Sequence, residues 1–344
     1  MNILKIKEAL EGFYRRYGAA IRFFGRVILG FLVFVMIRRE TGYLERLNSP
    51  VILTGLSLLC GILPANLCVL LAVGVVLLHF YSLSWCALAV GGGILMILLL
   101  LYFGIAPENG YGFLLTPVAF SLNVPLAVPM VLGLTSHSSS LFGMLFGTIW
   151  YFTMRTIGEK AAVLRTVQEN IVKTSDIEKV IGEGTSLIEG ILKRRELFLM
   201  LLVCLAVWIV VRTGRRMMIK YAWTVAIGLG TLVYLAIMIV GNDTLDLSWN
   251  LPAFVAGTVL ALLIALIVQL FLFLPDYRRV ESVQFEDDDY YYYVRAIPKK
   301  RSSEENPEPD RPETESMSRE ERRRMRRENR EPDLPQEPNR IERT

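Results

Sequence analysis

Long runs of hydrophobic residues alternate with short polar segments along the first 275 residues of the chain. A helix needs about 20 apolar residues to cross the ~30 Å hydrocarbon core of a bilayer. Six runs are expected to be membrane spans: Ala19–Ile37, Cys86–Gly104, Leu141–Ile157, Leu197–Val211, Tyr221–Val240 and Leu251–Leu274. The pattern therefore predicts an all-α polytopic membrane protein.

Two further apolar stretches, Val51–Leu83 and Tyr111–Thr135, are interrupted by proline. The interruptions fall at Pro64, Pro117, Pro125 and Pro129. The first arms, Val51–Leu63 and Gly112–Asn123, have only 13 and 12 residues, which is typical of re-entrant or buried half-helices. We expect each stretch to form a hairpin that either dips into the membrane and returns or crosses it twice. In both cases the chain emerges on the side where it entered.

The two stretches also resemble one another. They begin with Ile52-Leu53-Thr54 and Leu114-Leu115-Thr116, and each is followed by a span that contains closely spaced glycines. A unit of hairpin plus span crosses the membrane an odd number of times, so two consecutive copies form an inverted repeat, as in many transporters. The alternative is coincidence, in which Gly143 and Gly147 only let two helices pack closely.

Four polar residues beside the hairpin prolines or at the hairpin ends are candidates for lining a pathway: Asn66, Asn123, His79 and His137. For the two asparagines the alternative is that each caps a half-helix. The two histidines are the only ones in the chain and do not form a spaced ligand set, so we expect no metal site.

Basic residues set the expected orientation, because cytoplasmic loops of membrane proteins are enriched in Lys and Arg. Such residues cluster before the first span, between Arg212 and Lys220, and at Arg278 and Arg279, which predicts cytoplasmic N- and C-termini. The polar segment Gly158–Arg195 is predicted to form two helices with an apolar stripe. It is either a packed connector or a lid over a substrate path.

Several chemistries are absent from the sequence. Between Leu47 and Met154 the only charged residue is Glu108, so no relay of buried carboxylates is visible. No phosphate-binding loop, nucleophile elbow or H-E-x-x-H motif occurs, and we expect neither an enzyme nor a cofactor. Four cysteines lie inside apolar runs and are interpreted as small buried hydrophobic residues.

The last 69 residues hold half of all the charged side chains. Residues 276–298 contain two β-prone runs around an acidic turn and predict a cytoplasmic β-hairpin, and residues 299–344 have the composition of a disordered tail. Residues 279–298, and above all Tyr290, Tyr291, Tyr292 and Tyr293, are candidates for docking a partner protein or a second copy of the chain. The arginine-rich segment 318–330 is a candidate for contacting anionic lipid or an acidic partner, and no sequence-specific binding of nucleic acid is expected.

These boundaries divide the chain into six parts. They are a basic cytoplasmic segment (1–18), a membrane unit with both hairpins (19–157), amphipathic extramembrane helices (158–195), a three-span membrane unit (196–275), the β-hairpin (276–298) and the tail (299–344).

The stretch Val283–Lys299, VQFEDDDYYYYVRAIPK, resembles the tail of an uncharacterised family of multi-pass membrane proteins from Gram-positive anaerobic bacteria. The similarity extends to YAWTVAIGLG at Tyr221–Gly230 and to LTPVAF at Leu115–Phe120. Some members are labelled transporter permeases, so the resemblance implies a bacterial cytoplasmic membrane protein. It assigns no role to any residue.

Two hypotheses follow from the sequence. The first is a permease-like or lipid-handling protein without its own ATPase, whose hairpins form the pathway. The second is a non-transporting envelope scaffold that recruits partners through Arg279–Thr344.

Overall fold

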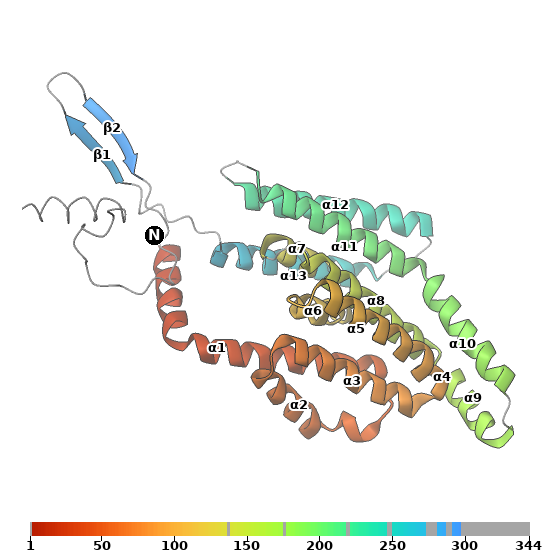
Figure 1. Ribbon diagram of the computed structural model, residues 1–344. Helices are drawn as coiled ribbons and strands as arrows, with labels where there is room; N and C mark the ends of the chain where they lie inside the picture. Colours follow the sequence, from red (N-terminus) through yellow and green to blue (C-terminus); the bar gives the residue numbers. More distant parts are fainter. Residues whose placement is uncertain are drawn as a thin grey trace, which may run out of the picture. The chain divides into compact units, whose positions relative to one another are not determined.

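A computed structural model of the chain describes residues 2–135, 138–174, 177–217, 221–245, 250–272, 281–286 and 291–296 (Figure 1). They belong to two units, Met1–Leu274 and Pro275–Thr344. The first unit is a bundle of α-helices and the second contains two β-strands. His137, Tyr290 and the tail 299–344 lie outside the described residues.

The helices follow the predicted order of apolar runs. They are α1 (Asn2–Thr41), η1 (Glu45–Asn48), α2 (Pro50–Ile62), α3 (Ala65–Leu83), α4 (Trp85–Ala87), η2 (Leu88–Gly92), α5 (Gly93–Ile105), α6 (Gly110–Ser121), α7 (Ala127–Thr135), α8 (Ser140–Glu159), α9 (Ala161–Thr174), α10 (Ile177–Leu192), α11 (Arg195–Gly214), α12 (Ala222–Leu245) and α13 (Leu251–Leu272).

Six helical stretches are long and apolar enough to cross a membrane, which supports an integral membrane protein. They are Arg16–Thr41, Ala65–Leu83, Trp85–Ile105, Gly182–Gly214, Ala222–Leu245 and Leu251–Phe271. Five of them overlap predicted spans, although Gly182–Gly214 also includes the second half of α10, which was predicted to lie outside the membrane. The expected span at Leu141–Ile157 is not among the six. The sixth stretch is instead α3, Ala65–Leu83, which was not predicted as a single span.

The difference at α8 has a physical reason. This helix of 20 residues is long enough to cross a bilayer, but the charged Arg155 near its end and three threonines lower its mean hydropathy. The hydroxyls of Thr148, Thr153 and Thr156 donate to carbonyls four residues earlier. All three threonines are buried. The polar hydroxyls of α8 are therefore hydrogen-bonded within the helix and buried in the bundle.

The interpretation of Val51–Leu83 as two short arms was also wrong in part. Pro64 is the N-cap of α3, so this proline starts a helix of 19 residues, which is long enough to span. The second stretch keeps its short arms, because α6 has 12 residues and α7 has nine.

The helices α6 and α7 occupy the interior of the bundle, in contact with α1, α3, α8, α11 and α13. Most of their residues are buried, including Pro117 and Pro129. Short helices leave unpaired backbone groups at their ends, which a membrane protein tolerates only where protein or an aqueous cavity surrounds them. Their central position meets this requirement.

Polar contacts mark the two ends of the bundle. The Nδ2 atom of Asn109, just before α6, donates to Oγ of Ser139, just before α8, over 2.6 Å, so the chain returns to the end where α6 began. At the other end of α6, the Ser121 hydroxyl donates to the Glu40 carboxylate at the end of α1 over 3.2 Å. We refer to this second end, opposite the start of α6, as the α8 exit.

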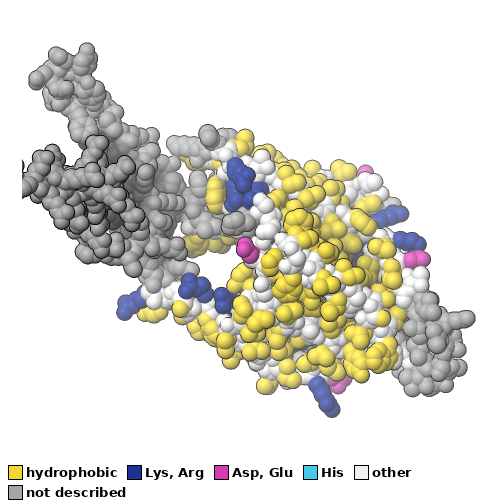
Figure 2. All heavy atoms as spheres, viewed as in Figure 1, with side chains coloured by type: hydrophobic (Ala, Val, Ile, Leu, Met, Phe, Trp, Pro, Cys, Tyr) yellow, Lys and Arg dark blue, Asp and Glu magenta, His cyan; other side chains and the backbone are white. Residues whose placement is uncertain are grey.

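A hydrophobic surface lies between these ends. Large apolar side chains are exposed on α1, α2, α5, α11, α12 and α13. The side of the molecule seen in Figure 2 is a broad apolar face, with most of its charged groups near the margins. An exposed apolar surface of this extent fits the hydrocarbon core of a bilayer.

Residues 158–195 contain two helices, α9 and α10, as the sequence predicted. Helix α10 contacts α8 and the α4–η2 segment, and the Lys160 ammonium donates to the Ser186 carbonyl oxygen over 2.7 Å.

In the second unit, β1 (Glu281–Glu286) pairs antiparallel with β2 (Tyr291–Ala296), with Glu281 opposite Ala296 and Glu286 opposite Tyr291.

Candidate functional site

A cavity of about 290 Å³ lies between the α6–α7 turn and helices α8, α11, α12 and α13. It is lined by Phe120, Asn123, Pro125, Tyr151, Phe152, Arg155, Glu196, Leu199, Met200, Tyr234, Met238, Asn250, Ala253 and Phe254. Its volume is near the lower end of the range for small-molecule sites. Most of the lining is aromatic or aliphatic, with a few polar groups, which is the usual composition of a ligand pocket.

The aromatic wall is held by ring contacts within and between helices. The Phe120 ring centroid is 5.4 Å from that of Tyr151 and 5.9 Å from that of Phe152. On the opposite side, the rings of Tyr234 and Phe254 stack at 5.6 Å, which joins α12 to α13. Such ring pairs add stability beyond the burial of their area, so these walls are preformed.

Four charged residues form a network beside the cavity, and two of them, Arg155 and Glu196, also line it. Arg194 donates to both carboxylate oxygens of Glu159, over 2.9 and 2.7 Å, and its Nε donates to Glu196 over 3.2 Å. Arg155 lies 3.4 Å from Glu159. The order is therefore Arg155, Glu159, Arg194, Glu196, with alternating sign and no net charge.

Arg194 is the centre of this network because it is the least exposed member. Its side chain is 13% exposed, against 52% for Glu159. It also donates to the Thr156 hydroxyl over 2.9 Å and lies over the Phe152 ring. The nearby guanidinium group lowers the pKa of the Glu159 carboxyl, so this group is ionised at neutral pH.

Asn123 is placed in the lining by the way α6 ends. Its N–H donates to the Phe120 carbonyl over 3.0 Å, and the N–H of Val124 donates to the Ala119 carbonyl over 2.8 Å. This pair of bonds is the Schellman ending, in which the residue after the helix has positive φ. Asn123 has φ of 60°, and asparagine tolerates this conformation better than most residues. The helix-cap alternative therefore describes Asn123, which lines the cavity as well.

The other predicted pathway residues lie elsewhere. The Tyr102 hydroxyl donates to Oδ1 of Asn66 over 2.6 Å, at the end of the bundle where α6 begins. His79 is buried, and its Nδ1 accepts from the Leu44 N–H over 3.2 Å. The structure therefore does not bring Asn66 or His79 together with Asn123.

Gly143 and Gly147 lie where α8 meets α6. A Cβ at Gly143 would be 3.0 Å from the Asn109 carbonyl oxygen, and one at Gly147 would be 2.8 Å from that of Phe113. Glycine at these two positions allows the two backbones to approach closely, and this approach positions the α8 wall of the cavity.

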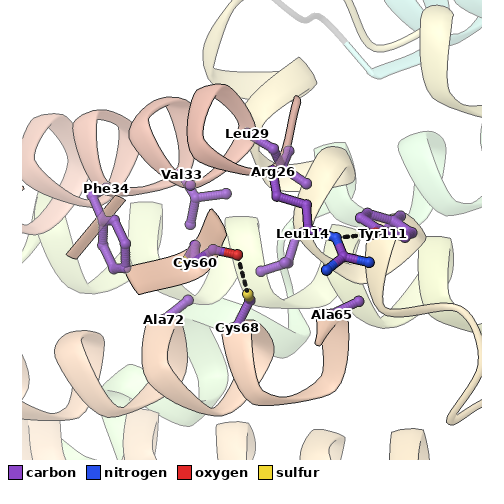
Figure 3. A pocket seen from close by; sticks show the side chains of 11 residues that line it. Arg26, Leu29, Val33, Phe34, Cys60, Ala65, Cys68, Ala72, Tyr111 and Leu114 are labelled. Carbon is purple, nitrogen blue, oxygen red and sulfur yellow. Dashed lines mark hydrogen bonds between the residues drawn. The ribbon is translucent and has the colours of Figure 1, made fainter. Parts of the chain in front are cut away.

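A second, much smaller pocket of about 10 Å³ lies among α1, α2, α3 and α6 (Figure 3). The Cys68 thiol there donates to the Cys60 carbonyl over 3.5 Å, and Arg26 Nε donates to the Tyr111 hydroxyl over 3.2 Å. This volume holds at most one water molecule, so the pocket is packing space.

All four cysteines are buried, and none of them forms a disulfide bond. Among the described residues, no group of three or more His, Cys, Asp or Glu side chains could hold a metal ion.

The sequence did not single out the charged residues and the second asparagine that line the cavity. Arg155, Glu196 and Asn250 lie at helix ends that are far apart in the chain, and only packing brings them together. The one available signal was Arg155, a charge that follows a long uncharged stretch. The sequence matches no protein-family model, no curated protein and no solved structure.

Proposed function

We propose that this chain is an integral protein of the bacterial cytoplasmic membrane that binds an amphipathic, membrane-soluble molecule and moves or presents it, without an ATPase of its own. The observation that carries the proposal is the cavity of about 290 Å³, whose lining is mostly aromatic and aliphatic but includes Arg155 and Glu196. An apolar chain fits against the aromatic side chains, and a polar head fits beside the two charged residues. In this proposal the α8 exit faces away from the cytoplasm, and both termini are cytoplasmic.

The second hairpin is the pathway element in this proposal. Its tip contributes Phe120, Asn123 and Pro125 to the lining, whereas no residue of α2 or α3 lines the cavity. A re-entrant role for α6 and α7 draws support from their short lengths and their burial. An inverted repeat draws less support, because α3 is ten residues longer than α7.

A cavity-filling variant tests the proposal. Ala253→Trp places a large ring in the lining, and Val255→Trp places the same ring on an exposed position of the same helix. The full chain is reconstituted in liposomes that contain a fluorescent phospholipid, and lipid that copurifies with each variant is quantified separately. We expect wild type and Val255→Trp to retain lipid and to accelerate its transfer between leaflets, and Ala253→Trp to lose both properties. Equal retention by all three proteins would exclude the cavity as the binding site.

The scaffold alternative is carried by the second unit. A ribbon of only two strands is marginally stable alone and gains from pairing with a further strand or surface. Proximity labelling from the C-terminus, with and without Gln284–Thr344, tests this role. Unchanged partners after the deletion would remove it.

A further inference from the structure

A surface depression adjoins the cavity at the α8 exit. It has a volume of about 530 Å³ and is lined by Arg38, Arg39, Glu40, Gly42, Tyr43, Arg155, Gly158 and Glu159. Arg155 lines the cavity as well as the depression. Arg155 therefore borders both spaces. Most residues that line the cavity are aromatic or aliphatic, and five of the eight that line the depression are charged.

The depression has an excess of positive charge, with three arginines and two glutamates in its lining. Both carboxylates are already engaged. Glu159 accepts two bonds from Arg194, and Glu40 accepts the Ser121 hydroxyl over 3.2 Å. Arg155 is only 3.4 Å from Glu159, a partly exposed pair that contributes little to stability. An anion in this space would therefore meet arginines whose charge is incompletely balanced.

The hydroxyl of Tyr43 is the second feature that points to a ligand. Its oxygen is buried, and it has no hydrogen-bond partner among the described residues. A Cβ at Gly158 would be 3.5 Å from this oxygen, so Gly158 lies directly beside the hydroxyl and presents no side chain to it. Burial raises the pKa of Tyr43 to about 12, so the group is a neutral donor at pH 7. Buried hydroxyls normally have a partner, and an acceptor is the missing one.

We propose that the depression binds the phosphate of a phospholipid headgroup through Arg38, Arg39, Arg155 and the Tyr43 hydroxyl, while an acyl chain of the same lipid occupies the cavity. Guanidinium groups match the geometry of phosphate oxygens, and a tyrosine hydroxyl adds a donor without adding charge. This inference rests on the proposed function and specifies its substrate class. The test below separates the failure of one from the failure of the other.

The experiment measures lipid binding to the purified full chain by native mass spectrometry. Phosphatidylglycerol competes with a neutral diglycosyl diacylglycerol that has the same acyl chains. We expect wild type to prefer the phospholipid by roughly tenfold, as for a few hydrogen bonds to a charged group. Tyr43→Phe changes no charge and should reduce phosphatidylglycerol binding by roughly tenfold, without lowering the unfolding temperature of the lipid-free protein.

Arg38→Gln should lower the preference for the phospholipid in the same way. Its matched control is Arg46→Gln, which removes the same charge from an exposed position in η1 outside the depression. Equal effects of these two variants would show attraction by net charge alone and would overturn the inference. An unchanged preference in Tyr43→Phe would also overturn it.

The variant Ala253→Trp tests whether the ligand of the depression is a lipid or a soluble phosphate compound. It should abolish binding of both lipids while leaving the depression intact. If inorganic phosphate protected the protein against thermal unfolding equally in wild type and Ala253→Trp, and no lipid bound, the site would be one for a soluble phosphate and the lipid inference would be wrong. If wild type bound both lipids equally well, and only Ala253→Trp reduced this binding, the proposed function would stand and the headgroup inference would fail.

Discussion

Gly147→Ala should separate α6 from α8 and lower the stability of the bundle. The added Cβ would lie 2.8 Å from the Phe113 carbonyl oxygen and 2.8 Å from the Thr116 Cβ, whereas ordinary contacts begin at 3.4 Å. The helices must therefore move apart by about 0.6 Å, the difference between these distances. The Phe113 oxygen belongs to the backbone, so no change of side-chain rotamer relieves the contact.

The magnitude follows from two opposing effects. Overpacking of this kind costs about 1–3 kcal/mol, and exchanging glycine for alanine in a helix stabilises it by about 1 kcal/mol. The net loss for Gly147→Ala is therefore about 0–2 kcal/mol. Gly104→Ala in α5 is the matched control, because nothing lies within 4 Å of its added Cβ and only the favourable effect remains. The difference between the two variants, about 1–3 kcal/mol, measures the overpacking.

The assay is thermal unfolding in detergent, followed with a thiol-reactive fluorophore that reports exposure of the buried cysteines. We expect the unfolding temperature of Gly147→Ala to be several degrees below that of Gly104→Ala. If Gly147→Ala were as stable as Gly104→Ala, α6 and α8 would not be in the close contact on which the α8 wall of the cavity depends.

Three further outcomes are expected. Glu159→Gln should lower stability at pH 7 by less than about 1 kcal/mol, because Glu159 is half exposed. Arg194 lowers the pKa of Glu159 from its usual 4.5, so this stabilisation is complete above pH 4.5 and is lost as the pH falls through the lowered value. The difference in stability between the variant and wild type should therefore be smaller at pH 3 than at pH 7 when unfolding is measured at both. Tyr102→Phe leaves Oδ1 of Asn66 without its donor and should cost about 1–3 kcal/mol in the same unfolding assay, and a loss below 0.5 kcal/mol would mean that water replaces the hydroxyl. The four buried cysteines should resist a polar maleimide in the folded protein and react after denaturation, and rapid labelling of the folded protein would contradict their burial.

The membrane class and most of the spans could be predicted from the sequence. The helices Ala222–Leu245, with Asp243 as its only charge, and Leu251–Phe271, with none, are long and apolar enough to cross a membrane, so hydropathy alone identifies them. The same reasoning failed at α3 and α8. Pro64 looked like an interruption but is the N-cap of a helix. Helix α8 was predicted as a span, but Arg155 near its end, together with its threonines, keeps its hydropathy below that of the six spans.

The candidate site was less predictable. Asn123 was chosen because it lies beside a proline, and it does line the cavity. Asn66 was chosen for the same reason and lies at the opposite end of the bundle, where it binds Tyr102. A neighbouring proline indicates a helix end, but it carries no information about which other helix ends lie beside it.

The amino-acid sequence is therefore sufficient to identify a multi-pass membrane protein with two proline-interrupted stretches, because hydropathy and chain breaks are properties of contiguous residues. The interior position of α6 and α7, the charged network shared by Arg155 and Glu196, and the cavity beside them become visible only in the folded chain. A site made from five separate helices depends on how those helices pack. Packing is set by contacts such as Gly147 against Phe113, which join positions far apart along the chain.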